Sequence, residues 1–329
     1  MPRAVIVTAL STEYLAVHEH LTDLREETHR QGTIYERGIF SVQGRNWEIV
    51  IAEIGAGNIG SAVETERAIA HFSPEVVLFV GVAGGVKDVA LGDVVASTKV
   101  YGYESGKAEQ TFRPRPEVVL SAHSLEQRAR AEAKRGDWLK RLHPSPATIP
   151  RVFVAPIASG EKVVASKESD IFNFLRSHYG DAVAVEMDGF GLLEAARINH
   201  AVPAIVIRGI SDLIDGKSKA DVEGFQEIAA RHASAFAFEL LAKLPKGKEE
   251  QRVSPARMKQ PRTQRELERL TELERQRTEL LQEIAKFENM RNRASSSATG
   301  DLENIIISRK ESLEKVDQEI SKIRNEIGE

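Results

Sequence analysis

The 329-residue sequence contains no cysteine, so disulfide bonds, thiolate nucleophiles and cysteine-ligated zinc or iron–sulfur centres are excluded. It also lacks any run of about 18 apolar residues, which a membrane-spanning helix needs, and its N-terminus has no apolar core with a cleavage site. Charge of either sign is in little excess, because 45 Lys+Arg oppose 49 Asp+Glu for a net charge of −4. These absences predict a cytoplasmic protein that binds neither nucleic acid nor a membrane.

Glycine and aromatic residues are scarce after Leu244, where Phe287 is the only aromatic residue. Residues 245–262 are rich in Lys, Arg, Gln and Pro, which favours an exposed basic linker. From residue 263 the apolar residues follow a 3–4 alternation that is interrupted at 295–300. This pattern predicts a two-helix coiled-coil module over 263–329, and it fits a helical hairpin within one chain as well as a bundle between chains.

Residues 1–244 are glycine-rich and alternate between short β-branched runs and helical stretches. That alternation predicts an α/β domain whose helices flank a largely parallel or mixed sheet. Ligands of such sheets bind beyond the carboxyl ends of the strands, so the segments that follow the strands are of interest. The expected strands are 4–9, 47–54, 76–82, 93–100, 152–156, 182–185 and 204–207, and the expected helices are 60–72, 121–142, 169–179, 189–199 and 223–244.

The segment GAGNIG at residues 55–60 matches the glycine pattern of dinucleotide-binding proteins. The acidic residue that should follow about twenty residues later is absent, because the next strand ends in VGVAGG at 80–85. The motif also follows a later strand than the first one, at 4–9. We therefore favour glycines that let a helix pack closely on the sheet, and we expect no NAD and no other cofactor.

Four segments at expected strand ends carry small or acidic residues, at 9–13, 81–85, 185–189 and 208–212. The acidic residues among them are Glu13, Glu186, Asp188 and Asp212. Each carboxylate by itself fits helix capping or loop structure. Carboxylates after three separate strands of one sheet are harder to explain that way, because such strand ends converge on one pocket and burying charge there is costly without a ligand or partner.

Together these segments resemble the nucleoside phosphorylase superfamily, and within it the methylthioadenosine/S-adenosylhomocysteine nucleosidase branch. The resemblance covers about residues 1–244 and implies a three-layer domain with a mixed central sheet. The tail after residue 245 has no counterpart in the housekeeping enzymes of this family. A nucleosidase-like domain joined to a helical module instead resembles bacterial defence effectors that deplete nucleotides.

The resemblance also implies roles for individual residues. Asp212 matches the acid that protonates the purine leaving group, and Glu13 matches the base that activates the attacking water. Such proton donation near pH 7 requires a carboxylic acid that burial keeps protonated. Asp188 matches the carboxylate that holds the ribose hydroxyls, and Ser211 matches the residue that orients the acid. The remaining substrate-binding positions are Ala83, Gly84, Glu186 and Met187.

The chain departs from the family pattern at several points. Asp188 is one methylene shorter than the usual glutamate, and Val82 replaces a small hydroxyl residue. No arginine occurs between Thr8 and Glu13 or immediately before Gly81, whereas phosphorolytic relatives carry an early phosphate-binding arginine. Hydrolysis is therefore expected. Two alternatives remain open, namely a phosphorolytic purine nucleoside phosphorylase and a non-catalytic nucleoside-binding scaffold that acts through its helices.

A short basic loop, TFRPRP at residues 111–116, is stiffened by its prolines and could hold a 5′-phosphate through Arg113 and Arg115. This would make AMP or ATP the substrate rather than a thioether nucleoside. We expect no metal site, since no His-Glu-x-x-His segment occurs and His18 and His20 are only two residues apart. We further expect a homo-oligomer and a protein partner bound through the C-terminal helices.

Overall fold

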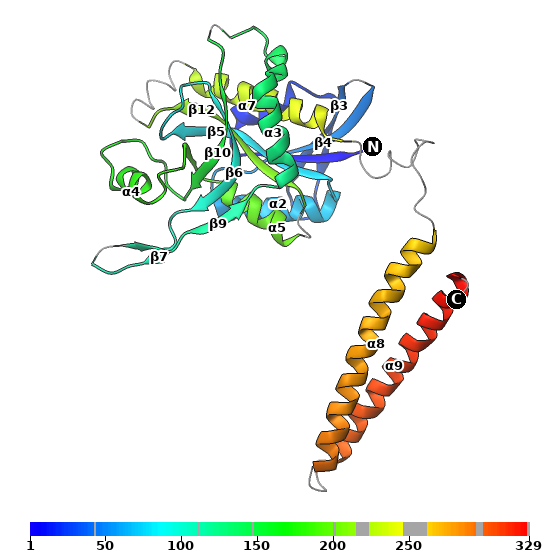
Figure 1. Cartoon of the computed structure of the whole chain (residues 1–329). Coiled ribbons are helices and arrows are strands. Elements are labelled where there is room, and N and C mark those ends of the chain that lie inside the picture. The colour runs from blue at the N-terminus through cyan, green and yellow to red at the C-terminus, as the bar shows by residue number, and fades with distance from the viewer. Residues whose placement is uncertain are drawn as a thin grey trace. The chain divides into compact units, whose positions relative to one another are not determined.

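The computed structural model describes residues 1–42, 44–110, 112–146, 148–199, 202–214, 224–245, 262–293 and 299–327. The chain divides into two compact units, Met1–Glu249 and Glu250–Glu329. Figure 1 shows a sheet flanked by helices in the first unit and a pair of long helices in the second.

The first unit alternates strands and helices along the chain (Figure 1). Its strands are β1 (Arg3–Thr8), β2 (Thr22–Thr28), β3 (Ile34–Val42), β4 (Arg45–Glu53), β5 (Val76–Gly85), β6 (Val94–Gly102), β7 (Gly106–Lys107), β8 (Arg113–Pro114), β9 (Glu117–Leu120), β10 (Val152–Ser159), β11 (Ala184–Glu186) and β12 (Ala204–Asp212). Its helices are α1 (Ser11–His18), α2 (Asn58–Phe72), α3 (His123–Arg135), α4 (Asp170–His178), α5 (Gly189–Ile198) and α7 (Phe225–Lys243), with a 3₁₀ helix at Asp137–Arg141.

Ten of the described strands form one mixed sheet in the order β11-β10-β6-β12-β5-β1-β4-β3-β2, with β9 paired to β6. Strands β4, β1, β5 and β12 run parallel to one another, whereas β6 is antiparallel to β12. At the far end, β11 is parallel to β10 and also pairs antiparallel with the end of β5. This second pairing curls the sheet back on itself, so that the ends of β5, β11 and β12 meet.

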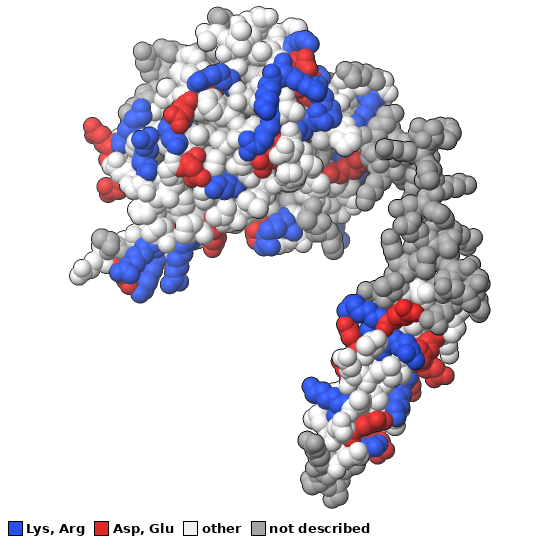
Figure 2. All heavy atoms as spheres, viewed as in Figure 1, with Lys and Arg blue, Asp and Glu red and all other residues white. Residues whose placement is uncertain are grey.

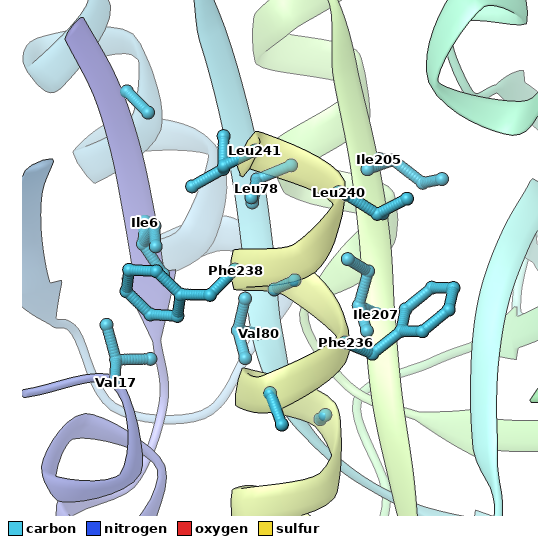
Figure 3. Packing of buried hydrophobic residues seen from close by; sticks show 14 of the residues in the cluster. Ile6, Val17, Leu78, Val80, Ile205, Ile207, Phe236, Phe238, Leu240 and Leu241 are labelled. Carbon is cyan, nitrogen blue, oxygen red and sulfur yellow. The ribbon is translucent and has the colours of Figure 1, made fainter. Parts of the chain in front are cut away.

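Side chains alternate between the two faces of β1, as the period of two in a strand requires. Ile6 packs on one face with α7, where Phe236 and Phe238 cover β1, β5 and β12 (Figure 3). Val5 and Val7 pack on the other face with residues of α2 and α5, including Ala68 and Leu192. Helices thus cover both faces of a mixed sheet, which confirms the predicted three-layer α/β architecture.

Some element boundaries were wrong. Strands β2 and β3 form an antiparallel pair that the sequence patterns did not indicate, because six of the seven residues of β2 are polar or charged and its side chains are mostly exposed. The helix expected over 121–142 ends at Arg135, since Gly136 adopts a left-handed backbone (φ 69°) and a 3₁₀ turn follows. Glycine tolerates that conformation and commonly ends helices.

In the second unit, α8 (Arg262–Arg293) and α9 (Thr299–Ile327) pack against each other within one chain. Ion pairs join Arg277 of α8 to Asp317 of α9, and Glu288 of α8 to Lys310 of α9. The later residue of α8 thus pairs with the earlier residue of α9, so the two helices are antiparallel. Figure 2 shows side chains of both signs interspersed along this hairpin. Residues 246–261, most of the predicted linker, lie outside the described residues. In the described residues, no helix is both long and apolar enough to cross a membrane.

Candidate active site

The curled end of the sheet brings the predicted strand-end segments together. In the strand register, Gly84 of β5 lies opposite Asp212 of β12 on one side and Val185 of β11 on the other. The start of α1 follows the adjacent strand β1. The segments at 9–13, 81–85, 185–189 and 208–212 therefore meet at one edge, although 199 residues separate Glu13 from Asp212 in sequence (212 − 13).

Glu13 lies in the first turn of α1 and folds back over the end of β1 with only 2% of its surface exposed. Its Oε2 accepts hydrogen bonds from the backbone of Ala9 (2.7 Å) and Leu10 (3.1 Å), and its Oε1 accepts one from Val82 (2.7 Å). Burial raises the pKa of Glu13 to about 7, against the opposing charge of Arg208. This carboxyl group therefore both caps its helix and changes protonation near neutral pH.

Asp188 and Glu186 share one buried cation, the guanidinium of Arg208. Arg208 Nη2 donates to Asp188 Oδ2 (2.7 Å) and to Glu186 Oε2. Glu186 also accepts hydrogen bonds from the backbone of Asp188 and Gly189, and burial raises its pKa while Arg208 opposes that shift. The other oxygen of Asp188 accepts the backbone N–H of Gly57 at 2.7 Å.

Arg208 was not among the predicted functional residues, yet it is at the centre of this group. It is fully buried beneath the site, 4.1 Å from the centre of the Phe79 ring, and its Nη1 lies 3.7 Å from Glu13 Oε1. Burial alone would lower its pKa, but the carboxylates of Glu186, Asp188 and Glu13 outweigh burial and raise it. A sequence signal did exist, because an arginine inside the apolar strand AIVIRGI is costly unless it is paired.

Glycines in β5 make room for these charged side chains. A Cβ on Gly81 would lie 2.2 Å from Arg208 Nη1 and 2.4 Å from Glu13 Oε1, and a Cβ on Gly84 would lie 3.1 Å from Asp212 Oδ1. At Gly81, the structure gives that space to the protein's own Glu13 and Arg208.

Asp212 is 2% exposed at the end of β12. Its Oδ1 accepts the backbone N–H of Ile214 (3.1 Å), and its Oδ2 lies 3.1 Å from the hydroxyl of Ser211. That hydroxyl is also 3.4 Å from the carbonyl oxygen of Ala83. Ser211 thus links the carboxyl group of Asp212 to the glycine turn and restricts its orientation.

A cavity of about 220 Å³ opens between these segments. All eight residues predicted for catalysis or for binding the base and sugar line it: Glu13, Ala83, Gly84, Glu186, Met187, Asp188, Ser211 and Asp212. The rest of its lining includes Ala9, Leu10, Val82 and Val185 from the predicted strand-end segments and Ala56 from the glycine motif. The sequence patterns missed Lys162, Val163, Val164 and Gln226. Residues 162–164 had no motif that could have revealed them, because they come from a loop after β10.

The glycine motif at 55–60 has a different role from the one favoured above. Gly60 has ample space, since a Cβ there would be 4.0 Å from its nearest neighbour, whereas a Cβ on Gly191 of α5 would lie 2.0 Å from the carbonyl oxygen of Asn58. The close approach is therefore between two helices and is provided by Gly191. Gly57, with φ of 128°, turns its N–H toward Asp188.

Arg113 and Arg115 do not line the cavity. They lie on or next to β8, in the arm that carries β7 and extends away from the large sheet (Figure 1). The Arg113 side chain is 73% exposed and pairs with Glu109 at 2.9 Å. Thr111 of the same loop lies outside the described residues.

Glu132, Asp137 and Glu239 form the one group of three carboxylates in the described residues whose oxygens all lie within 4.8 Å of one another, as the ligands of a metal ion would. The ammonium of Lys243 lies among them, 2.6 Å from oxygens of Glu132 and Asp137 and 3.0 Å from Glu239. A lysine thus already supplies the positive charge there.

Comparison with known proteins identifies the family. A family model described as the phosphorylase superfamily matches residues 3–242. ATP nucleosidase Cap17 from Escherichia coli is 29% identical to the chain over 260 residues, which cover 70% of this chain and 49% of that protein. The chain thus spans about half the length of the curated relatives it matches.

Solved structures show the same fold. A 5′-methylthioadenosine/S-adenosylhomocysteine nucleosidase from Helicobacter pylori is 25% identical with a TM-score of 0.61, covering 74% of this chain and 99% of that one. A futalosine hydrolase from the same species is 24% identical with a TM-score of 0.61, covering 74% of this chain and 98% of that one. Both structural matches cover about the same share of the chain as the family model does.

Proposed function

The chain belongs to the phosphorylase superfamily, and from this premise we propose that it hydrolyses the N-glycosidic bond of a purine nucleoside or nucleotide, with adenine as the favoured base. We assign this activity to residues 1–244, and assembly to the helices of residues 263–329. The observation that carries the proposal is the convergence of Glu13, Asp188 and Asp212 on one cavity. The protein holds each of these carboxyl groups in place, Asp188 through Arg208 and Glu13 and Asp212 through backbone N–H groups, so that an acid, a base and a third carboxylate share one cavity.

Each carboxyl group has a distinct task in the proposed reaction. Water attacks C1′ of the ribose while the bond from C1′ to the purine nitrogen breaks and its electron pair passes to the base. Asp212 donates a proton to N7 of the leaving purine, and Glu13 accepts the proton of the attacking water. Asp188 holds the ribose hydroxyls and offers negative charge to the oxocarbenium-like sugar. One water is consumed, and the products are free base and the ribose compound.

Water is favoured over phosphate as the nucleophile because of the charges around the cavity. Lys162 is the one lysine or arginine among the described lining residues, and it pairs with Glu104 at 2.5 Å. Arg208, beneath the site, is engaged by Glu186 and Asp188. A phosphate dianion would have to compete with carboxylates for these cations, whereas a neutral water would not.

We further propose a nucleotide, AMP or ATP, as the substrate. The curated relative is an ATP nucleosidase, which supports an adenine nucleotide. Contact of Arg113 and Arg115 with a 5′-phosphate stays a prediction. If they hold it, replacing both by alanine lowers ATP turnover and leaves adenosine turnover unchanged; an equal effect on both substrates, or none, refutes that role.

The experiment for the reaction is chromatography of free base released from adenosine, methylthioadenosine, AMP and ATP, with and without phosphate. We expect phosphate-independent release by the wild type and a loss of about 10²-fold or more in Asp212→Asn. Release that requires phosphate would support the phosphorylase alternative. Binding of adenine without release from any of the four substrates would support the nucleoside-binding scaffold.

The helical module supports a further proposal about assembly. Apolar side chains remain exposed on the hairpin, including Leu281 at 41%, Ile305 at 40% and Ile307 at 52%. We propose that these bind a second copy of the chain or a protein partner, as in a nucleotide-depleting defence effector. Light scattering of the wild type and of Ile305→Lys/Ile307→Lys tests self-association, which should be lost or reduced in the variant.

A further inference from the structure

A second and larger cavity, of about 950 Å³, lies in the first unit. It is formed by the loop before β6, the segment between the 3₁₀ helix and β10, the first turns of α7, and residues at and just after the end of α1. The described residues that line it include none of those that line the candidate active site. Its volume is within the range of ligand pockets, about 300–1,000 Å³.

Much of the lining is apolar. Phe225 and Ile228 of α7 line one part of the cavity. Leu213, which directly follows Asp212 of the active site in sequence, also lines it. Pro144, Pro146 and Pro150 belong to the segment that precedes β10. Ile228 is 40% exposed and Ile149 is 72% exposed, so apolar surface remains open to a ligand.

Three guanidinium groups belong to the same lining. Arg141 lies over the Phe40 ring and pairs with Glu239, and Arg151 lies over the Phe153 ring. Their planar groups are thus held in place by aromatic rings. Arg231 projects from α7 one turn after Ile228 and is 39% exposed.

The carboxylates that pair with Arg231 hold it only weakly. Arg231 pairs with Glu19 at 3.4 Å and with Glu227 at 3.1 Å, and the side chains of both glutamates are more than half exposed. Exposed ion pairs of this kind contribute only about 0–1 kcal/mol, so an anion that enters the cavity can replace them. Arg151 is held more firmly, because its partner Asp93, at 3.1 Å, is buried, but the Arg151 side chain is itself 62% exposed and can donate to a further anion.

Two histidines add uncharged polar groups. His20 stacks on Phe238 with ring centres 4.3 Å apart, and burial lowers its pKa to about 4. His232 Nδ1 lies 2.7 Å from the carbonyl oxygen of Gly92. Burial lowers its pKa as well, so both rings are neutral near pH 7.

We propose that this cavity is a second ligand site, separate from the active site, for a small organic anion with a flat apolar body. The apolar surface of Phe225, Ile228 and Leu213 would contact the body, and Arg151 and Arg231 would bind the anionic group. Guanidinium forks suit sulfonate, phosphate and carboxylate oxygens. This site does not depend on the proposed hydrolysis, and its test does not use activity.

The test uses 8-anilinonaphthalene-1-sulfonate, a fluorescent compound with a flat apolar body and one sulfonate, titrated into the full-length protein. We expect saturable binding that weakens at least tenfold in Ile228→Trp, which places a larger side chain inside the cavity, and in Arg231→Glu, which reverses one charge. Naphthalene-1-sulfonate should displace the probe, and sulfate should do so far less well. The hairpin variant Ile305→Lys/Ile307→Lys should bind the probe as tightly as the wild type.

Circular dichroism and melting temperature confirm that each variant is folded. Equal probe affinity in wild type and Arg231→Glu would overturn the proposal, and this variant changes a side chain that is 39% exposed. Loss of binding only in the hairpin variant would overturn it too, by placing the probe on α9. Stoichiometric displacement by adenine would assign the probe to the active site instead.

Discussion

Individual residues of the site combine structural and chemical constraints. Glu13 is a helix-capping carboxylate, as its position alone suggested, and it also lines the cavity. Arg208 neutralises part of the negative charge that the site gathers, and it lies 3.7 Å from Glu13. The pKa of Glu13 and the stability of this part of the fold therefore depend on the same buried arginine.

The pH dependence of catalysis follows from Glu13. A general base must be ionised, and burial raises the pKa of Glu13 to about 7. We expect kcat/KM for adenine release to rise about tenfold per pH unit below pH 7, which is the limb that Glu13 sets. Initial rates from pH 5 to 9 measure this limb. A profile that is already level at pH 5.5 would contradict Glu13 as the base.

Replacement of Arg208 should affect both stability and this profile. Arg208→Met leaves three carboxyl groups without their buried cation, and removing one partner of a buried ion pair costs about 3–5 kcal/mol. Because Arg208 lowers the pKa of Glu13, its loss should move the activity limb to higher pH. Urea unfolding and the pH profile measure the two effects. Arg208→Lys, which keeps the charge, should show a smaller shift; an unchanged free energy of unfolding in Arg208→Met would refute this role.

At the scale of elements, the contact between α2 and α5 positions Asp188, the carboxylate that we propose holds the ribose. Gly191 lets α5 approach the first residue of α2, and the neighbouring Gly57 N–H binds Asp188. The close approach accounts for Gly191, and the positive φ of Gly57 accounts for the glycine before α2. The contact could not be recognised from the glycine motif itself, because the residue that permits it lies 133 positions after Asn58, in another helix.

Two glycine-to-alanine substitutions test this contact. Gly191→Ala places a Cβ 2.0 Å from the Asn58 carbonyl and should destabilise the protein by about 1–3 kcal/mol, since backbone must move. It should also raise the KM for the nucleoside, because the start of α2 shifts away from Asp188. Gly60→Ala is the matched control, with space for a Cβ and an expected gain of about 0.5–1 kcal/mol. Thermal unfolding and steady-state kinetics compare them; equal stability of both variants would contradict the interpretation.

For the whole molecule, the composition is an average over two unlike units. The net charge of −4 and the 41% hydrophobic content combine a glycine-rich α/β unit with a charged helical hairpin. Among the described side chains of the hairpin, Val316 packs against the buried cluster Leu270, Leu273 and Ile320, and Ile284 and Ile306 are also buried. Isolated helices are marginally stable in water, so the hairpin depends on this apolar packing.

A charge inside the hairpin should separate the two units in function. Ile284→Asp places an unpaired carboxylate at a site that is 6% exposed, so it should unfold the hairpin. Adenine release should change by less than about twofold, because the described residues that line the cavity all belong to the first unit. Circular dichroism at 222 nm follows helix loss. The exposed control Leu281→Asp should keep its helicity, and a loss of turnover in Ile284→Asp alone would show that activity needs the hairpin.

The sequence by itself determined the α/β class, the helical tail and the acidic and glycine segments of the site, because these depend on periodicity and on local residue chemistry. Tertiary structure alone decided how they combine. The return of β11 onto β5 brings Gly84 between Val185 and Asp212, a pairing between distant segments that no local pattern encodes. It also decided the role of Arg208, which is the buried cation shared by Glu13, Glu186 and Asp188. Glu13 is 195 positions from Arg208 in sequence, so the two side chains come together only in the folded protein.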